Sequence, residues 1–363
     1  MNAIVKANGY DITIGDKALL GLFQFLENVR YEGPIFILTD ESACNYCVPE
    51  LLRVVEPLDS VEIIQVVNGE DQKSIDVCMD IWAVLDEKEA NKQSLLINLG
   101  GEMICDMGAF VAATYMGGID FIHVPTTLLA MVDTPIENRA ALNWGDMKNH
   151  IGFKAKPQGV FVYPGFLETL DRRQILSGFA EMLNYGLTED VKLWEKLKNV
   201  DVDYTLKLAP YIHQAIVTKY NMLNTESTND VSNRFINFAY KVGHAVEVFS
   251  QTHNALPLLY GEALSVGIVC EAYISWGKGL LSQEQLKEIT FYVKSLYQPH
   301  SLPPQYDKEH LRLMGFDKKK STVPFTLLKQ IGTCVPRQMV DMELVKSAFS
   351  YYRKEFSNIA ALN

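Results

Sequence analysis

Two apolar runs that end in small or hydroxylated residues are the part of this chain best suited to binding a phosphate. Ser94–Leu99 stops at Gly100 and Gly101, which indicates a buried strand meeting a turn where the backbone comes close to a ligand. Phe121–Val124 repeats the strand pattern, and Thr126 is then predicted to cap a helix. Two adjacent strand-to-helix corners of this kind form a nucleotide-binding crevice in doubly wound sheets.

A polar pair ends another predicted strand near the N-terminus. Pro34–Leu38 is apolar and is followed by Thr39 and Asp40. An acid at the carboxyl end of a parallel strand can hold a ribose hydroxyl, so Asp40 is predicted to bind a cofactor, and a helix cap is the alternative. A further strand is expected at Val61–Val67, and helical spacing of apolar residues predicts a helix over Ile75–Glu87.

Long helical patterns replace the strand signals after about Asp171. They cover Arg173–Tyr185, Leu206–Leu223, Phe235–Phe249, Gly261–Trp276 and Ser282–Leu296. We therefore predict an α/β N-terminal nucleotide-binding domain over residues 1–168 and a mainly α-helical C-terminal domain over residues 169–363.

The bulk composition is that of an ordinary globular protein. The 363 residues are 48% hydrophobic and carry a formal net charge of -11, which argues against nucleic acid or an anionic membrane as the main partner. Cys44 and Cys47 form a C-x-x-C pair that could be redox-active or bind zinc, but buried core thiols are the favoured interpretation. Without a secretory pattern or a stretch of about 20 apolar residues, a cytoplasmic location without membrane association is expected.

Three motifs resemble those of the 3-dehydroquinate synthase family. The sequence from Gly100 to Asp133, GGEMICDMGAFVAATYMGGIDFIHVPTTLLAMVD, is similar to the family pattern GGGxxxDxxGFxAATYxRGxxxxxxPTTLLAxVD. Ser177–Gly186 matches GxAExxKYG, while Asn237–Glu247 and Tyr260–Glu262 match LNxGHxxGHAxE and HGE. The resemblance spans nearly the whole chain. It implies a dehydroquinate synthase-like fold and homodimer in the sugar phosphate cyclase superfamily, whose shikimate-pathway member is an NAD-dependent carbon–oxygen lyase that closes a carbocycle from a seven-carbon sugar acid phosphate.

The metal site that the resemblance implies is altered here. In the family, one glutamate and two histidines hold a catalytic zinc, and the matching positions are Glu181, Tyr240 and Tyr260. Phenol side chains have an unperturbed pKa of about 10 and are poor zinc ligands, so we expect no zinc. The favoured interpretation is that the tyrosines fill the space and hydrogen-bond to Glu181 or His244. Recruitment of His253, or ferric iron bound by phenolates, are the alternatives.

The cofactor side retains more of the family pattern. The predicted NAD-binding residues are Asp40, Glu70, Lys73, Gly100, Gly101, Asp106, Thr126, Thr127 and Lys148. Glu102 replaces the third glycine of the family motif. A carboxylate about 4 Å from a pyrophosphate would cost about 4 kcal/mol at an effective dielectric constant of 20. We therefore expect NAD to bind weakly unless Glu102 points outward.

The residues for catalysis and substrate binding are only partly retained. The resemblance predicts His244, Lys219, Asp133 and Asn237 for catalysis, and Arg139, Asn149, Lys318 and Lys319 for substrate binding. The last two lie in a basic run that would otherwise be a solvated loop. Gly117 stands where the family has an arginine that crosses the dimer interface, and Asn184 replaces a lysine. Asn233 replaces a second arginine, although Arg234 beside it could compensate. The substrate pocket is expected to be short of positive charge.

These patterns favour a 3-dehydroquinate synthase-like protein that has lost the zinc-dependent cyclase activity and binds a small polyol or sugar phosphate. One alternative is an active NAD-dependent synthase or related cyclase with an altered metal site, which would act on a less phosphorylated polyol with His244 as acid or base. The other is a non-catalytic binding or regulatory module that pairs with an active relative.

Overall fold

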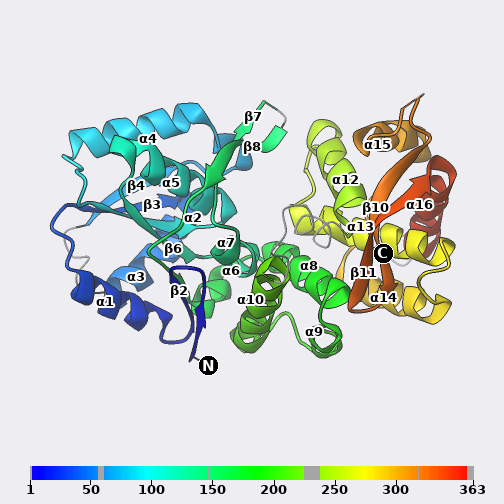
Figure 1. Ribbon diagram of the computed structural model, residues 1–363, viewed down its shortest axis with the longest axis horizontal. Helices are drawn as coiled ribbons and strands as arrows, with labels where there is room; N and C mark the ends of the chain where they lie inside the picture. The colour runs from blue at the N-terminus through cyan, green and yellow to red at the C-terminus, as the bar shows by residue number, and fades with distance from the viewer. Residues whose placement is uncertain (1, 56–60, 146, 225–237, 318, 358–363) are drawn as a thin grey trace. The chain divides into compact units, whose positions relative to one another are not determined.

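The computed structural model describes residues 2–55, 61–145, 147–224, 238–317 and 319–357 (Figure 1). The chain forms two compact units, which are described separately. Unit 1 comprises Met1–Ile175 and Asp203–Val217, and unit 2 comprises Leu176–Val202 and Thr218–Asn363. Unit 1 is α/β and unit 2 is mainly helical, as predicted for the fold class. The boundary after residue 168 stays a prediction, because the chain crosses between the units more than once.

Unit 1 is built on a seven-stranded sheet in the order β1-β2-β9-β6-β5-β3-β4. The strands are β1 (Asn2–Lys6), β2 (Asp11–Gly15), β3 (Ile35–Asp40), β4 (Glu62–Val66), β5 (Leu95–Gly100), β6 (Asp120–Pro125) and β9 (Gly159–Val162). All neighbours are parallel except β1 and β2. The four strands predicted from the sequence are present as β3, β4, β5 and β6, with ends that agree within one residue. The chain order reverses between β3 and β5, which is where open α/β sheets bind ligands.

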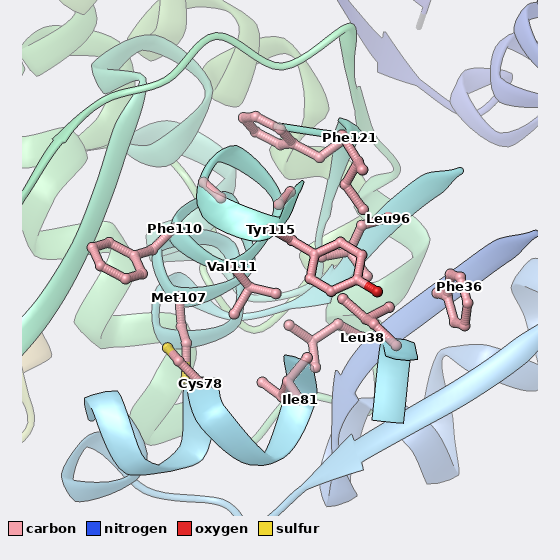
Figure 2. Packing of buried hydrophobic residues seen from close by; sticks show 14 of the residues in the cluster. Phe36, Leu38, Cys78, Ile81, Leu96, Met107, Phe110, Val111, Tyr115 and Phe121 are labelled. Atoms are coloured by element: carbon pink, nitrogen blue, oxygen red, sulfur yellow. The ribbon is translucent and has the colours of Figure 1, made fainter. Parts of the chain in front are cut away.

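The core of unit 1 lies between this sheet and the helices α4 (Ile75–Glu87) and α5 (Glu102–Thr114). Figure 2 shows Ile81 of α4 and Val111 of α5 in one cluster with Leu38 and Leu96 of the sheet. Complete burial of such a side chain stabilises the fold by about 1.5 to 3 kcal/mol. The remaining α-helices of unit 1 are α1 (Ala18–Val29), α2 (Glu41–Tyr46), α3 (Val48–Val54), α6 (Leu128–Val132) and α7 (Thr134–Glu137).

A β-hairpin of unit 1 was not predicted from the sequence. It consists of β7 (Arg139–Trp144) and β8 (Met147–Lys154), and its buried residues Ala140–Leu142 pack against α5. The strands have six and eight residues, and no residue of β8 is buried, so the run of buried apolar residues that marks the central strands of the sheet is missing from this half of the hairpin. The hairpin matters for the site because it carries Arg139 and Asn149.

Unit 2 combines helices with a second hairpin. Its helices are α9 (Val191–Leu197), α12 (Tyr240–His253), α13 (Tyr260–Gly277), α14 (Gln283–Leu296), α15 (Asp307–Leu313) and α16 (Met342–Ser357), and it shares α8 (Arg172–Thr188) and α10 (Ala209–Asn224) with unit 1. α10 begins after a 3₁₀ turn, three residues later than predicted, and the predicted helix start at 235–237 lies outside the described residues.

The hairpin of unit 2, β10 (Thr322–Gln330) and β11 (Thr333–Asp341), was also missed from the sequence. Each strand contains a proline, Pro324 or Pro336, and proline argues against a strand because it has no N–H for the ladder. A two-stranded sheet tolerates proline because each strand has one unpaired edge. Across the described chain, every helix is too short or too polar to traverse a bilayer.

Candidate functional site

Parallel pairing brings the carboxyl ends of β3, β5 and β6 to one edge of the sheet. Thr39 pairs with Leu99, and Gly100 pairs with Pro125. The backbone N–H of Thr126 donates to the Gly100 carbonyl at 2.9 Å and ties the two corners together. The structure therefore places the predicted corner residues side by side.

Helix α6 is capped by Thr127, so the predicted cap at Thr126 was wrong by one residue. The Thr127 hydroxyl accepts the backbone N–H of Ala130 at 3.2 Å, while Thr126 is still in the turn that follows β6. Asp40 is also a helix cap, since its carboxylate accepts the N–H of Ala43 at 2.8 Å at the start of α2. Burial raises the pKa of Asp40. Its binding to a cofactor stays a prediction.

The corner that follows β5 leads into the N-terminus of α5. Gly101 is the N-cap in an extended conformation, and a Cβ on it would lie 3.3 Å from Cγ2 of Thr127. Glycine therefore lets the two corners approach closely. The free N–H groups of the first turn of this 13-residue helix favour negative charge, and Glu102 is its first residue.

A buried network of charges lies beside this corner. Asp106 Oδ2 receives Lys73 Nζ at 2.6 Å and Arg139 Nε at 2.7 Å, and both Asp106 and Lys73 are fully buried. Arg139 also pairs with Glu102 and, at 2.6 Å, with Glu137. Glu102 is thus paired with Arg139, which differs from the two orientations considered from the sequence. We call Glu70, Lys73, Glu102, Asp106, Glu137 and Arg139 the charge cluster.

The charge cluster contains more carboxylates than cations. Burial opposes the charge of Lys73, but nearby carboxylates, Asp106 foremost, outweigh it and raise the pKa of the ammonium. Arg139 is likewise opposed by burial and supported by Glu102 and Asp106, and its pKa is raised well above the usual value. Burial raises the pKa of Asp106 and of Glu102. Arg139 therefore has its charge balanced within the protein, and it is a weaker attractor for an external phosphate than a lone arginine would be.

One carboxylate oxygen of the charge cluster has no hydrogen-bond partner among the described residues. It is Asp106 Oδ1, although the Asp106 side chain is fully buried. Buried carboxylate oxygens are normally satisfied, so an orphan acceptor points to a ligand or water that donates a hydrogen bond. A sugar hydroxyl is such a donor.

The hairpin residues Asn143 and Asn149 connect the charge cluster to β8. Lys73 Nζ donates to Asn149 Oδ1 at 2.5 Å, and the Asn149 N–H donates to Asn143 Oδ1 at 2.8 Å. Asn143 in turn donates to both the carbonyl and the carboxylate of Glu70 at 3.0 Å. Asn143 was not predicted, and no local sequence pattern marks it. The structure thus joins Glu70, Lys73, Asp106, Arg139 and Asn149 in one network, with Asp133 buried after α6 and Lys148 half-buried on β8.

In unit 2, the three positions that the resemblance assigns to a metal site come together. Glu181 of α8 is buried, and its two oxygens each accept a phenol hydroxyl: Tyr240 at 2.5 Å and Tyr260 at 2.9 Å. The two ring centroids are 6.3 Å apart. These are the hydrogen bonds to Glu181 that the favoured sequence interpretation predicted. We call Glu181, Tyr240 and Tyr260 the phenol–carboxylate cluster.

The donor set of this cluster does not suit zinc. Both oxygens of Glu181 already accept hydrogen bonds, and its neighbours are phenols rather than imidazoles. In the described part of the chain, no three His, Cys, Asp or Glu side chains converge as metal ligands. His253, the alternative ligand, stacks on Phe249 with centroids 4.0 Å apart and has Nε2 3.8 Å from Glu309.

The other residues predicted for catalysis and substrate binding are more scattered. His244 is exposed on α12. Lys219 is fully buried on α10, with Nζ 5.7 Å from the ring centroid of Tyr185. Asn184 is buried and its Oδ1 has no partner among the described residues. Lys319 is exposed, and Asn237 and Lys318, like Asn233 and Arg234, lie outside the described residues.

Sequence reasoning missed one buried acid near the phenol–carboxylate cluster. Glu271 of α13 is fully buried and accepts the backbone N–H groups of Ala239 and Val242, which flank Tyr240. Burial raises its pKa to about 8. The available signal was an acid in the middle of the apolar sequence of α13, far from the first turn where Glu262 lies.

Comparisons with known proteins show the family to which the chain belongs. Two family models match consecutive parts of the chain: 3-dehydroquinate synthase N-terminal over residues 63–177 and 3-dehydroquinate synthase C-terminal over residues 178–320. The 3-dehydroquinate synthase of Parabacteroides distasonis is 33% identical over 341 residues, which is 92% of this chain and 95% of that protein. That of Streptococcus thermophilus is 28% identical over 346 residues, 94% and 97% of the two chains.

Solved structures share the whole fold. A 2-deoxy-scyllo-inosose synthase complexed with carbaglucose-6-phosphate, NAD+ and Co2+ superposes with a TM-score of 0.83 at 19% identity, over 97% of this chain and 99% of that one. The 2-epi-5-epi-valiolone synthase of Streptomyces hygroscopicus, with NAD+ and Zn2+ bound, has a TM-score of 0.79 at 19% identity and the same coverage. At this identity the likeness establishes the fold alone.

Proposed function

The chain belongs to the 3-dehydroquinate synthase family, and from that premise we propose that it is a member that has lost the zinc-dependent cyclisation carried out by its relatives. The phenol–carboxylate cluster carries this proposal. Tyr240 and Tyr260 stand at the histidine positions of the family and both donate to Glu181, so the carboxylate is occupied by hydroxyl groups rather than prepared for a metal. A catalytic zinc needs ligands of another kind and an open position.

Weak capture of phosphate supports the same proposal. Gly117 replaces the family arginine, and a Cβ on Gly117 would lie 3.4 Å from the ammonium of Lys92. A lysine supplies a point charge but lacks the planar fork that binds a phosphate through two hydrogen bonds. Asn184 replaces a second cation, and Arg139 is held by three carboxylates of the charge cluster.

NAD binding is retained in this proposal, at reduced affinity. Gly100 and Gly101 leave room for a pyrophosphate at the N-terminus of α5, and the orphan oxygen of Asp106 suits a ribose hydroxyl. When bound, NAD would supply reversible hydride transfer at a carbinol. The Glu102 carboxylate beside the same helix terminus weakens the attraction for a dinucleotide. A homodimer in the cytoplasm, as the family suggests, completes the proposal.

The test measures metal content and phosphate release. The wild-type protein, purified without chelator, should contain much less than one zinc per chain. It should release no phosphate from the seven-carbon sugar acid phosphate with NAD and zinc, whereas the Parabacteroides distasonis synthase should do so under the same conditions. The Tyr240→His/Tyr260→His variant should gain metal but little turnover. One tightly held zinc per wild-type chain, or release at the rate of the relative, would refute the proposal.

A second function is favoured by the pairing of Arg139 with three carboxylates of the charge cluster. An arginine whose charge is already balanced suits an uncharged polyol, which NAD could oxidise without a metal and with His244 as the base. NADH formation with a panel of unphosphorylated polyols tests this function. A rate that disappears in His244→Ala would support it, and the absence of NADH from every polyol would reject it.

A further inference from the structure

The turn that precedes Tyr240 has an unfavourable backbone. Ala239 has φ 69° and ψ -17°, the left-handed conformation, and it is fully buried as the N-cap of α12. An alanine in this conformation is strained because its Cβ approaches the carbonyl oxygen. A conformation of this kind persists only where neighbouring groups hold it. The direction in which Tyr240 leaves the turn therefore depends on those groups.

Glu271 supplies the contacts that hold this turn. Its Oε2 accepts the N–H of Ala239 at 2.9 Å, and its Oε1 accepts the N–H of Val242 at 3.0 Å. Both donors lie at the N-terminus of α12, where backbone N–H groups lack partners within the helix. The carboxylate belongs to a different helix, α13, so it fixes the first turn of α12 from outside.

Close contact between the two helices makes these hydrogen bonds possible. Gly267 lies one turn before Glu271 on α13, and a Cβ on it would lie 2.0 Å from the carbonyl oxygen of Ala239. Gly243 of α12 faces the same helix, since its Cβ would lie 3.2 Å from Cα of Leu264. Two glycines thus bring the backbones together, and a short carboxylate side chain then reaches the turn.

We propose that Glu271 is a positioning residue that holds the Ala239 turn and thereby presents the Tyr240 hydroxyl to Glu181. Tyr240 is the first residue of α12 and follows the turn directly, whereas Tyr260 is the first residue of α13 itself. α13 therefore orients one tyrosine covalently and the other through Glu271. The inference rests on the role assigned above to the phenol–carboxylate cluster, and it adds the residue that maintains it.

The experiment follows the phenol carbon signals of Tyr240 and Tyr260 by NMR of protein labelled with ¹³C in tyrosine, with assignments from Tyr240→Phe and Tyr260→Phe. The comparison is made above pH 8, where Glu271 is ionised, because the amide of Glu271→Gln then has one acceptor oxygen where the carboxylate has two for the two N–H donors. The Tyr240 signal should move toward that of a solvent-exposed tyrosine, while the Tyr260 signal stays. Adding Ala239→Gly should restore the Tyr240 signal, because glycine adopts this turn without strain.

The matched control is Glu262→Gln, which removes another capping carboxylate from the same helix. Glu262 accepts the N–H of Leu259 at 2.7 Å, beside Tyr260, so its loss should leave the Tyr240 signal in place. An unchanged Tyr240 signal in Glu271→Gln, or a loss that Ala239→Gly does not restore, would overturn the proposal.

If Glu271→Gln does not fold, the proposal is tested by hydrogen exchange of the wild-type protein. The amides of Ala239 and Val242 should be protected like the interior of α13, and exchange at the rate of an unstructured chain would overturn the proposal. None of these measurements depends on metal or turnover. A zinc-loaded or active wild-type protein would therefore refute the proposed function without being confused with a failure of this inference.

Discussion

Asp106 is the residue whose replacement should most disturb unit 1. Its Oδ2 holds Lys73 at 2.6 Å and Arg139 at 2.7 Å, and the Asp106 and Lys73 side chains are both fully buried. In Asp106→Asn the amide cannot neutralise either cation, and its NH₂ group introduces donors where two donors already converge. Lys73 then keeps Glu70, at 3.8 Å, and the more distant charge of Glu102 from the remaining cluster.

The size of the effect follows from this burial. Breaking a buried ion pair by removing one partner typically costs about 3 to 5 kcal/mol in the free energy of unfolding. With a shift of roughly 2 to 4 °C per kcal/mol for a domain of this size, the melting temperature should fall by roughly 6 to 20 °C. Thermal unfolding followed by circular dichroism measures this, and hydrogen exchange of the α5 amides localises it to unit 1.

Glu70→Gln is the matched control. It removes a carboxylate from the same cluster, but the Glu70 side chain is 38% exposed and lies as far as 3.8 Å from Lys73. Its loss should therefore lower the free energy of unfolding by less than about 1 kcal/mol. If Asp106→Asn were no more destabilising than Glu70→Gln, the reasoning that Asp106 is the main counter-ion of the charge cluster would be refuted.

Three further predictions concern Glu102, Glu271 and Ala239. Glu102→Gln should strengthen NAD binding about tenfold or less, which corresponds to about 1.4 kcal/mol or less, because the pyrophosphate no longer competes with the Glu102 carboxylate for Arg139 and the α5 terminus. Equal affinities of the two proteins by calorimetry would contradict this prediction. Burial raises the pKa of Glu271 from 4.5 to about 8, so between these values the folded chain holds a proton that the unfolded chain has lost. Stability should therefore fall as the pH rises from 5 to 8, by up to about 1.4 kcal/mol per pH unit, and urea titrations of Glu271→Gln should show a flatter profile. Ala239→Gly should stabilise the protein by about 1 kcal/mol by relieving the left-handed turn, and a lower midpoint in urea would show that alanine is unstrained there.

Much of the secondary structure of unit 1 depends on local sequence patterns and was therefore predictable. The strands that end at Asp40, Gly100 and Pro125 are compact apolar runs stopped by residues that cannot continue them, and such signals need no tertiary partner. Their parallel pairing follows from the alternation of strands and helices. The motif register also placed Tyr240 and Tyr260 opposite Glu181, because family spacing preserves position even where the residue type has changed.

Only the tertiary structure decided how the charges pair. From the sequence, Glu102 was expected either to lie close to a pyrophosphate or to face the solvent. In the structure it forms an ion pair with Arg139, which neither expectation included. That partner, Arg139, is brought to it by the hairpin β7–β8, which the sequence did not reveal. An ion pair depends on the distance between side chains far apart in sequence, and local patterns carry no information about that distance.

The same reason explains why Glu271 escaped notice. Within the sequence it is an acid in the middle of an apolar helix, and its role depends on Gly267 and Gly243 bringing a second helix into backbone contact. The sequence by itself determined the strands, the turns that follow β5 and β6, and the residues that lie beside Glu181. The tertiary structure decided which of the buried charges and N–H groups satisfy one another, because burial makes each unsatisfied group costly and only the folded arrangement provides its partner.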